Sequence, residues 1–260
     1  MPTVSATDHP PTIHAFEPVM GTVVTFDVRL DDPSRERELY LALARARSVL
    51  HRVDAIFSLW KPESPMSRVR RGELDLEDAP AEIAEVLARC VEAKELTRGF
   101  YDALALPGGI DPTGLVKGWG TERAMRAINA AGFFDVLVNA GGDVAASGGP
   151  NRGEAWRVGI RHPNDRLGLL GVVEGAPAVA TSGTYERGSH LFHPHERRFS
   201  AGFVSATVVG PELALADALA TGLCVAGEEG LCFLAAIEGF EGFGVTTEGA
   251  VTKSSGFFFD

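Results

Sequence analysis

The stretch that decides the fold runs from Gly109 to Gly148 and reads GIDPTGLVKGWGTERAMRAINAAGFFDVLVNAGGDVAASG. A helical pattern in its first half ends at Gly132, an apolar strand follows at 136–138, and a Gly-Gly-Asp turn comes at 141–143. The segment therefore predicts a helix, a strand and a tight turn in direct succession.

A polar loop is expected just before this helix. It combines an acid, two small residues and a lysine, which are Asp111, Thr113, Gly114 and Lys117. Such a loop leaves backbone amides and carbonyls accessible beside a helix N-terminus, where phosphates bind readily. Purely structural turns have a similar composition, so this loop alone does not distinguish a phosphate-binding loop from a structural turn. Motifs elsewhere in the chain are needed to distinguish them.

The remaining patterns predict a single α/β unit with mixed sheets. There is no internal repeat and no low-complexity linker, so we expect one domain over residues 14–260 after a loose polar tail at 1–13. The expected helices cover 33–59, 80–99, 211–227 and 229–238, beside the helix described above. The expected strands cover 20–28, 134–140, 155–161, 169–174 and 203–210, with a terminal hairpin at 242–247 and 250–258.

Composition and charge restrict the possible partners. The chain has 260 residues and a net charge of −11 at pH 7, which argues against nucleic acid and anionic membranes as partners. No stretch approaches the roughly 20 apolar residues of a membrane span. The N-terminal residues show neither a basic region followed by an apolar run nor a lipidation cysteine, so we expect a cytoplasmic protein. A polyanionic ligand would need local cations or a metal ion.

The chain contains three cysteines, Cys90, Cys224 and Cys232, and all of them lie in apolar helical patterns. An odd number of cysteines in such patterns predicts buried free thiols, with neither a disulfide framework nor a zinc site.

Asp217 and Thr221 lie four residues apart on the helix expected at 211–227, so both side chains share one face. A carboxylate and a hydroxyl on one face are ligands that Mg²⁺ accepts, since this cation prefers oxygen donors. The alternative is that Thr221 bonds back to a helix carbonyl while Asp217 is solvated.

A small polar run follows at 180–187, and a group of histidines comes after it. Hydroxyls and amides in the run, Thr181 among them, either hold a ribityl chain or a phosphate or form an exposed turn. His190, His193 and His195 have spacings that match no standard zinc pattern. One of them is better interpreted as a general base or a phosphate partner.

Several aromatic and apolar residues form a candidate slot for a flat ring. They are Met20, Trp60, Phe100 and Tyr101, with Asp102 beside them. Each of these residues, considered alone, is equally suited to a hydrophobic core.

In this order the motifs resemble those of the ApbE family, the FAD:protein FMN transferases, over about residues 14–257. The motifs are Met20-Gly-Thr, Ser58-Leu-Trp60…Ser64, Phe100-Tyr-Asp102, Asp111-x-x-Gly114-x-x-Lys117-Gly118, Val138-Asn-Ala-Gly-Gly-Asp143, Ala180-Thr-Ser-Gly…Tyr185-Glu-Arg187, His190-x-x-x-Pro194 and Ala216-Asp-Ala-Leu-Ala-Thr221. Each motif is loose, but eight in the right order are improbable by chance.

The resemblance implies a T-fold-like domain that holds FAD in a cleft, with Mg²⁺ at the pyrophosphate. The metal ligands carry over to Asp217, Thr221 and the backbone carbonyl of Gly114. His190 matches a family histidine near the reaction centre. FAD contacts carry over to Met20, Trp60, Phe100, Tyr101, Asp102, Asp111 and Lys117.

The activity implied by the resemblance is cleavage of FAD, with release of AMP and attachment of FMN to a Thr or Ser of an acceptor flavoprotein. Mg²⁺ and Lys117 would neutralise the pyrophosphate, and His190 would accept the proton of the acceptor hydroxyl. Two alternatives stay open: a Mg²⁺-dependent hydrolase that splits FAD into FMN and AMP, and a non-catalytic protein that stores FAD.

The chain departs from the family pattern at two places. Val69-Arg70 stands where relatives commonly have Leu-Asn, and His193-Pro194-His195-Glu196-Arg197 stands where they usually have Asp-Pro-x-Thr-Gly. Both departures bear on the balance between transfer and hydrolysis more than on the fold.

Overall fold

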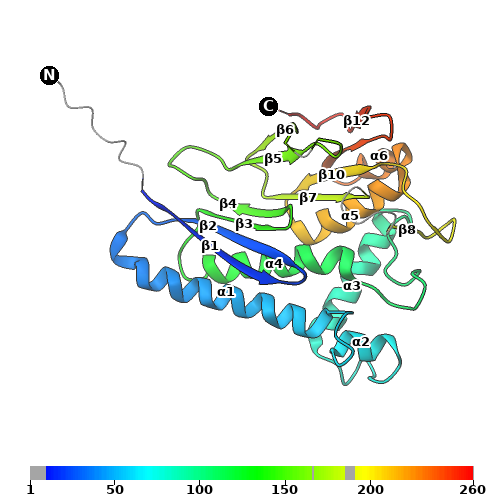
Figure 1. The fold of residues 1–260 in the computed structure, drawn as a ribbon, viewed down its shortest axis with the longest axis horizontal. Coiled ribbons are helices and arrows are strands. Elements are labelled where there is room, and N and C mark those ends of the chain that lie inside the picture. The colour runs from blue at the N-terminus through cyan, green and yellow to red at the C-terminus, as the bar shows by residue number, and fades with distance from the viewer. Residues whose placement is uncertain (1–9, 166, 185–190, 260) are drawn as a thin grey trace.

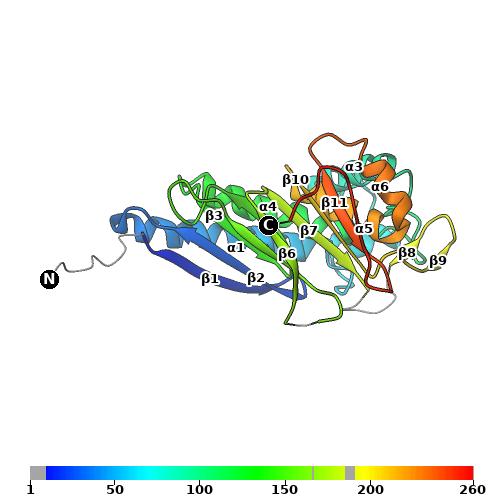
Figure 2. The ribbon, with the colours of Figure 1, turned by 90° about the horizontal axis from the view of Figure 1, so that it is seen from above.

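An eight-stranded sheet forms the centre of the fold in the computed structural model, which describes residues 10–165, 167–184 and 191–259 (Figure 1). Its neighbouring strands are antiparallel throughout, and Figure 2 shows them side by side across the molecule. In spatial order they are β1 (Thr12–Val19), β2 (Thr22–Arg29), β3 (Val136–Ala140), β4 (Asp143–Ser147), β7 (Ala178–Gly183), β10 (Ser205–Gly210), β11 (Glu241–Val245) and β12 (Val251–Lys253). The expected combination of helices and sheets in one α/β unit is confirmed, but the expectation of mixed sheets is wrong, because all strand pairs of the described residues are antiparallel.

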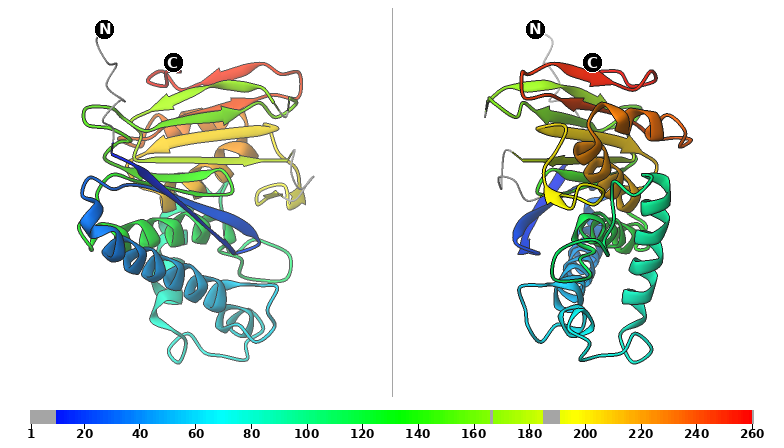
Figure 3. Two further views of the ribbon diagram at one scale, coloured as in Figure 1. Left: turned by 60° about the vertical axis from the view of Figure 1, so that its left-hand side comes forward. Right: turned by 90° about the vertical axis from the view of Figure 1, so that its right-hand side faces the viewer.

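Helices cover one face of this sheet, and a hairpin with the C-terminal residues covers part of the other (Figure 3). The helices are α1 (Glu36–Phe57) after the short 3₁₀ helix η1 (Pro33–Arg35), α2 (Pro65–Arg70), α3 (Ala81–Leu96), α4 (Thr113–Asn129), α5 (Leu213–Ala226) and α6 (Glu228–Leu234). The hairpin on the opposite face consists of β5 (Arg157–Arg161) and β6 (Leu169–Glu174). A second small hairpin joins β8 (Phe192–His193) and β9 (Arg198–Phe199).

The long first helix follows the sequence pattern closely. Asp32 accepts a hydrogen bond from the backbone N–H of Ser34 and so caps η1, and Pro33 occupies its first position. Every apolar residue of the predicted stripe is buried, namely Leu39, Leu43, Ala46, Leu50, Val53 and Phe57. The apolar side of α1 therefore packs inward against the sheet and α4.

The N-terminal segment differs from the prediction, because it forms a hairpin where a single strand was expected at 20–28. Met20 and Gly21 form the turn between β1 and β2, with φ of 54° and 70°. Two successive residues with positive φ match the hairpin turns whose twist fits antiparallel strands. The first strand begins at Thr12, inside the stretch expected to be a loose tail.

One further prediction about the polar motifs is wrong, and one alternative that the sequence left open is not what the structure shows. Gly114 and Lys117 lie in the first turns of α4, not in a loop before it. The run expected as a possible exposed turn at 180–187 is, over its described residues, the end of β7 at the centre of the sheet. Strand β4 also lacked a prediction, because its Ala and Ser residues show no alternation of apolar and polar side chains.

The cysteine prediction is correct for two of three residues. Cys90 and Cys224 are buried free thiols, whereas Cys232 is free but exposed. In α6 the buried residues are Gly230, Phe233 and Leu234, so Cys232 lies on the outer side of this short helix. Over the described residues, no helix is long and apolar enough to cross a membrane.

Helices α4 and α5 approach each other closely at Gly118. A β-carbon placed on Gly118 would lie 2.5 Å from the carbonyl oxygen of Leu213 and 3.1 Å from the α-carbon of Ala214. Backbone atoms cannot move aside as a flexible side chain can, so only glycine permits this contact. The contact sets the distance between the helix that carries Lys117 and the helix that carries Asp217.

We predict that Gly118→Ala lowers the free energy of unfolding by about 1–3 kcal/mol, the usual cost of overpacking, although alanine is intrinsically the better helix former. Gly120→Ala is the matched control on the same helix, because its β-carbon would meet only the Val53 side chain, at 3.1 Å. Urea unfolding of both variants measures the difference. Equal midpoints for the two variants would contradict the close backbone contact.

Candidate active site

Three charged side chains from distant parts of the chain meet between the sheet and the helices. Lys117 of α4 lies with its Nζ 2.6 Å from Oδ2 of Asp143, the first residue of β4. Asp217 of α5 lies near enough for the charge of Asp143 to raise its pKa, after burial itself. Asp143 and Asp217 are almost completely buried, while the Lys117 side chain is one-third exposed. We refer to Lys117, Asp143 and Asp217 as the charged cluster.

Backbone amides fix both carboxylates of the charged cluster. The N–H of Gly118 donates to Oδ2 of Asp217 at 3.1 Å, and the N–H of Thr181 donates to Oδ1 of Asp143 at 3.1 Å. In a regular helix the N–H of Gly118 bonds to the carbonyl of Gly114. The Asp217 carboxylate therefore accepts from the same donor as that carbonyl would. A carbonyl oxygen has two lone pairs, so the Gly114 carbonyl can accept a further ligand.

The surroundings of Asp217 favour its protonated form. Burial raises its pKa to about 8, the charge of Asp143 acts in the same direction, and Lys117 together with the N–H of Gly118 opposes the shift. Two carboxyl groups and one ammonium leave an excess negative charge in a buried place when all three are ionised. A further cation at this position would remove the conflict.

Hydroxyl groups adjoin the charged cluster. Oγ1 of Thr221 lies 3.0 Å from Oγ of Ser182, and Oγ1 of Thr181 lies 2.9 Å from Oγ1 of Thr207. A β-carbon on Gly114 would come within 3.3 Å of Oγ1 of Thr221, so α4 and α5 are also close here. The alternative in which Asp217 is solvated and Thr221 bonds back to its own helix is thus not what the structure shows.

The donor set suits a hard divalent cation. Asp217, Thr221 and the Gly114 carbonyl supply oxygen atoms only, as Mg²⁺ prefers, and the cluster supplies negative charge. No group of three or more His, Cys, Asp or Glu side chains suited to a metal ion is found within the described ranges.

Two of the predicted flavin-contacting acids have structural partners of their own. Oδ1 of Asp111 accepts from the N–H of Thr113 at 3.0 Å and from its hydroxyl at 2.6 Å, and so caps the start of α4. Asp102 pairs with Lys94 at 2.7 Å and accepts from the N–H of Leu104 at 2.9 Å. Both acids lie in or beside the segment 102–111, which leads from α3 into α4.

The aromatic residues do not form one exposed slot. Phe100 and Tyr101 are buried in the main core, and the hydroxyl of Tyr101 lies 3.3 Å from Sγ of Cys90. Trp60 is 96% exposed, whereas Met20 in the β1–β2 turn packs against the core. Their roles in flavin binding remain predictions carried by the resemblance.

His190 lies outside the described residues, so its role also remains a prediction. The two histidines that follow it contact Phe100 edge to face, with ring centroids at 5.5 Å for His193 and 4.8 Å for His195. The hairpin formed by β8 and β9 is thereby held against the segment that follows α3.

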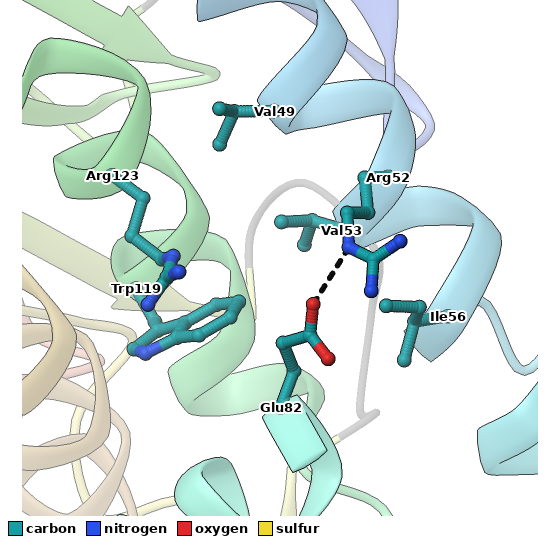
Figure 4. A pocket seen from close by; sticks show the side chains of 7 residues that line it. All are labelled: Val49, Arg52, Val53, Ile56, Glu82, Trp119 and Arg123. Atoms are coloured by element: carbon teal, nitrogen blue, oxygen red, sulfur yellow. Dashed lines mark hydrogen bonds and ion pairs between the residues drawn. The ribbon is translucent and has the colours of Figure 1, made fainter. Parts of the chain in front are cut away.

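A small cavity lies on the other side of α4, between α1 and α3 (Figure 4). It has a volume of about 80 Å³, and Trp119 and Arg123 of α4 face Val53 of α1 across it. Trp119 follows Lys117 by two residues and so lies on the opposite side of the helix. Because ligand pockets usually measure about 300–1,000 Å³, this cavity is not a candidate for a flavin site.

Sequence reasoning missed Asp143 as a site residue and did not predict the contact between Ser182 and Thr221. Asp143 was assigned to a turn, although an acid directly after two glycines, within a motif that matches the family, was a usable signal. Ser182 belongs to the polar run at 180–187, but its contact with Thr221 depends on the pairing of β7 with its neighbours.

We predict that Asp217→Asn stabilises the cation-free protein, and more so at pH 8 than at pH 5. In the unfolded chain the carboxyl ionises near its ordinary pKa of about 3.9, whereas in the fold it keeps its proton up to about pH 8. Between these values the folded state binds more protons than the unfolded state, so this group lowers stability as pH rises. Asparagine does not titrate. At pH 8 the free energy of unfolding of Asp217→Asn should exceed that of the unmodified protein by more than about 1.4 kcal/mol, which corresponds to a shift of one pKa unit.

Denaturant unfolding in the presence of a chelator, at pH 5 and pH 8, measures this gain. A stability difference between Asp217→Asn and the unmodified protein that does not change with pH would show that Asp217 ionises normally in the fold.

Solved structures of flavin transferases share this fold. The flavin transferase ApbE from Vibrio cholerae aligns with a TM-score of 0.79 and 21% identity, covering 95% of this chain and 98% of that one. The apo form of the Pseudomonas stutzeri flavinyl transferase ApbE aligns with a TM-score of 0.81 and 21% identity, covering 96% of each chain. At this level of identity the likeness establishes the fold.

Sequence comparison identifies the family. An FAD:protein FMN transferase of Rhodobacter capsulatus is 37% identical over 165 residues, which is 57% of this chain and 30% of that protein. An Escherichia coli protein of the same name is 30% identical over 156 residues, 56% of this chain and 44% of that protein. The match spans less than half the length of each of these relatives. The ApbE family model matches residues 20–108 and 104–243, and the chain therefore belongs to the ApbE family.

Proposed function

We propose that this chain is a Mg²⁺-dependent FAD:protein FMN transferase. It would cleave the pyrophosphate of FAD, release AMP and attach FMN through a phosphoester to a Thr or Ser of an acceptor flavoprotein. Family membership and the names of the relatives in Rhodobacter capsulatus and Escherichia coli support this assignment.

The observation that carries the proposal is the charged cluster. An acidic protein can hold a pyrophosphate only where cations offset its charge, and Lys117 provides one at a position where two buried carboxylates favour a second. Lys117 retains enough exposure to reach a ligand, while Asp143 keeps its ammonium oriented. This combination of an anchored lysine and a cation site is suited to phosphoryl chemistry.

The proposed Mg²⁺ ligands are the carboxylate of Asp217, the hydroxyl of Thr221 and the backbone carbonyl of Gly114. When bound there, Mg²⁺ would polarise the phosphoryl oxygens and offset the charge of the leaving group. The chain's own part is to hold these ligands rigidly: Gly118 fixes Asp217, and Ser182 orients Thr221.

Proton transfer is assigned to His190, which would accept the proton of the acceptor hydroxyl. The hydroxyl of a bound acceptor protein reacts more readily than water, because binding has already fixed its position and orientation. We therefore expect transfer to dominate when an acceptor is present, with slow hydrolysis of FAD in its absence.

The deciding experiment incubates the protein with FAD and Mg²⁺, with and without a flavoprotein acceptor that carries its target Thr. We expect slow release of AMP from FAD alone, faster release with the acceptor, and a mass increase of the acceptor equal to bound FMN. AMP accumulation without any acceptor mass gain would make the protein a hydrolase. If neither product appears, the protein stores FAD.

Two variants test the metal ligands in the same assay. Asp217→Ala should nearly abolish AMP release, because it removes the charged ligand, and Thr221→Ala should retain more activity. The control is Asp165→Asn, which alters an exposed acid in the β5–β6 hairpin away from the charged cluster. A fully active Asp217→Ala variant would refute the metal assignment.

We also predict that the protein binds FAD more tightly than FMN, and FMN more tightly than riboflavin. Lys117 and the metal ligands all recognise the pyrophosphate, which FMN has in part and riboflavin lacks entirely. Calorimetry with the three flavins in the presence of Mg²⁺ measures the order. Equal affinities would mean that binding depends on the isoalloxazine ring alone.

A further inference from the structure

Arg70, the last residue of α2, contacts the segment 102–111 across a large gap in sequence. Its Nε donates to the carbonyl of Gly108 at 2.7 Å, and its Nη2 donates to the carbonyl of Pro107 at 3.2 Å. Its Nη1 lies 3.9 Å from Oδ2 of Asp111. One guanidinium group therefore contacts three residues of the segment, two of them through directed hydrogen bonds.

The backbone of the segment 102–111 approaches the Arg70 side chain closely at Gly108 and Gly109. Gly108 and Gly109 have φ of 93° and 100°, values that residues with a β-carbon rarely adopt. A β-carbon on Gly108 would lie 2.9 Å from Nη2 of Arg70, and one on Gly109 would lie 3.4 Å from its Cγ. Two successive glycines thus let the backbone approach the arginine closely enough to present its carbonyl groups.

The segment that Arg70 holds leads directly into α4. The N–H of Asp111 donates to the carbonyl of Ala103 at 2.8 Å, which closes the segment at its base. Asp111 then caps α4 through Thr113. Arg70 is therefore connected, through Asp111, to the helix that carries Gly114 and Lys117.

We propose that Arg70 is a positioning residue that holds the segment 102–111 and the start of α4 in the arrangement that binds FAD. The inference rests on the proposed function for its ligand, but the contacts themselves do not depend on it. With its Nε and Nη2 engaged by carbonyl groups, Arg70 acts through the segment and not as a ligand of the phosphate. Lysine cannot replace it fully, because one ammonium does not reproduce the planar fork of donors.

The first test measures hydrogen–deuterium exchange in the ligand-free protein. We expect Arg70→Gln to speed amide exchange within 102–111 by about tenfold, the effect of losing one charge-assisted hydrogen bond. Arg70→Lys should give an intermediate rate. Arg71→Gln is the matched control, since its guanidinium contacts Glu73 and the carbonyl of Pro62 and not this segment. Unchanged exchange in Arg70→Gln would overturn the proposal whatever the activity.

The second test measures FAD affinity and turnover. For Arg70→Gln we expect Kd and KM for FAD to rise about tenfold, with kcat within about twofold of the unmodified protein, and with partial rescue in Arg70→Lys. A fall in kcat at unchanged KM would place Arg70 in the chemical step and overturn the positioning role. If the protein turns over no FAD, the proposed function fails, and exchange together with calorimetric FAD binding still decides the role of Arg70.

Discussion

The close contact between α4 and α5 at Gly118 is the constraint on which the candidate site depends. The absence of a side chain there lets the backbones approach, and the N–H of Gly118 then reaches the carboxylate of Asp217. The same approach brings Gly114 close to the hydroxyl of Thr221. A larger residue at position 118 would separate the helix that carries Lys117 from the helix that carries Asp217 and Thr221, and the oxygen atoms of these residues and of Gly114 would no longer converge.

The residues of the charged cluster, Lys117, Asp143 and Asp217, lie on helices and strands of the core. Asp143 starts a central strand, and its carboxylate takes one hydrogen bond from the neighbouring strand β7 and one ion pair from α4. Rigid elements hold a site more precisely than loops do. The segment 102–111 leads into α4, and the β8–β9 hairpin packs on Phe100 through His193 and His195.

Much of the fold could be predicted from the sequence, because its helices are long and periodic. The stripe from Leu39 to Phe57 and the stops at Gly132 and Gly227 placed three of the helices well. Strands β4 and β7 were not predicted, because both are short, consist mostly of small residues and lie at the centre of the sheet. Buried strands of this kind do not show the alternation of apolar and polar side chains from which a strand is predicted. Of the site, Asp217 and Thr221 followed from helical spacing, whereas the ion pair between Lys117 and Asp143 depends on tertiary packing that no local pattern encodes.

The buried pair Asp143 and Asp217 has a consequence for the protein in the cell. Because burial, reinforced by the charge of Asp143, raises the pKa of Asp217 to about 8, the ionised form of Asp217 destabilises the fold. A cation that bound Asp217 in the native state alone would shift the unfolding equilibrium toward that state. Under the proposed function, the unfolded fraction available to proteases would fall as Mg²⁺ becomes abundant. The supply of such a cation would then set how long each molecule survives, without any change in its synthesis.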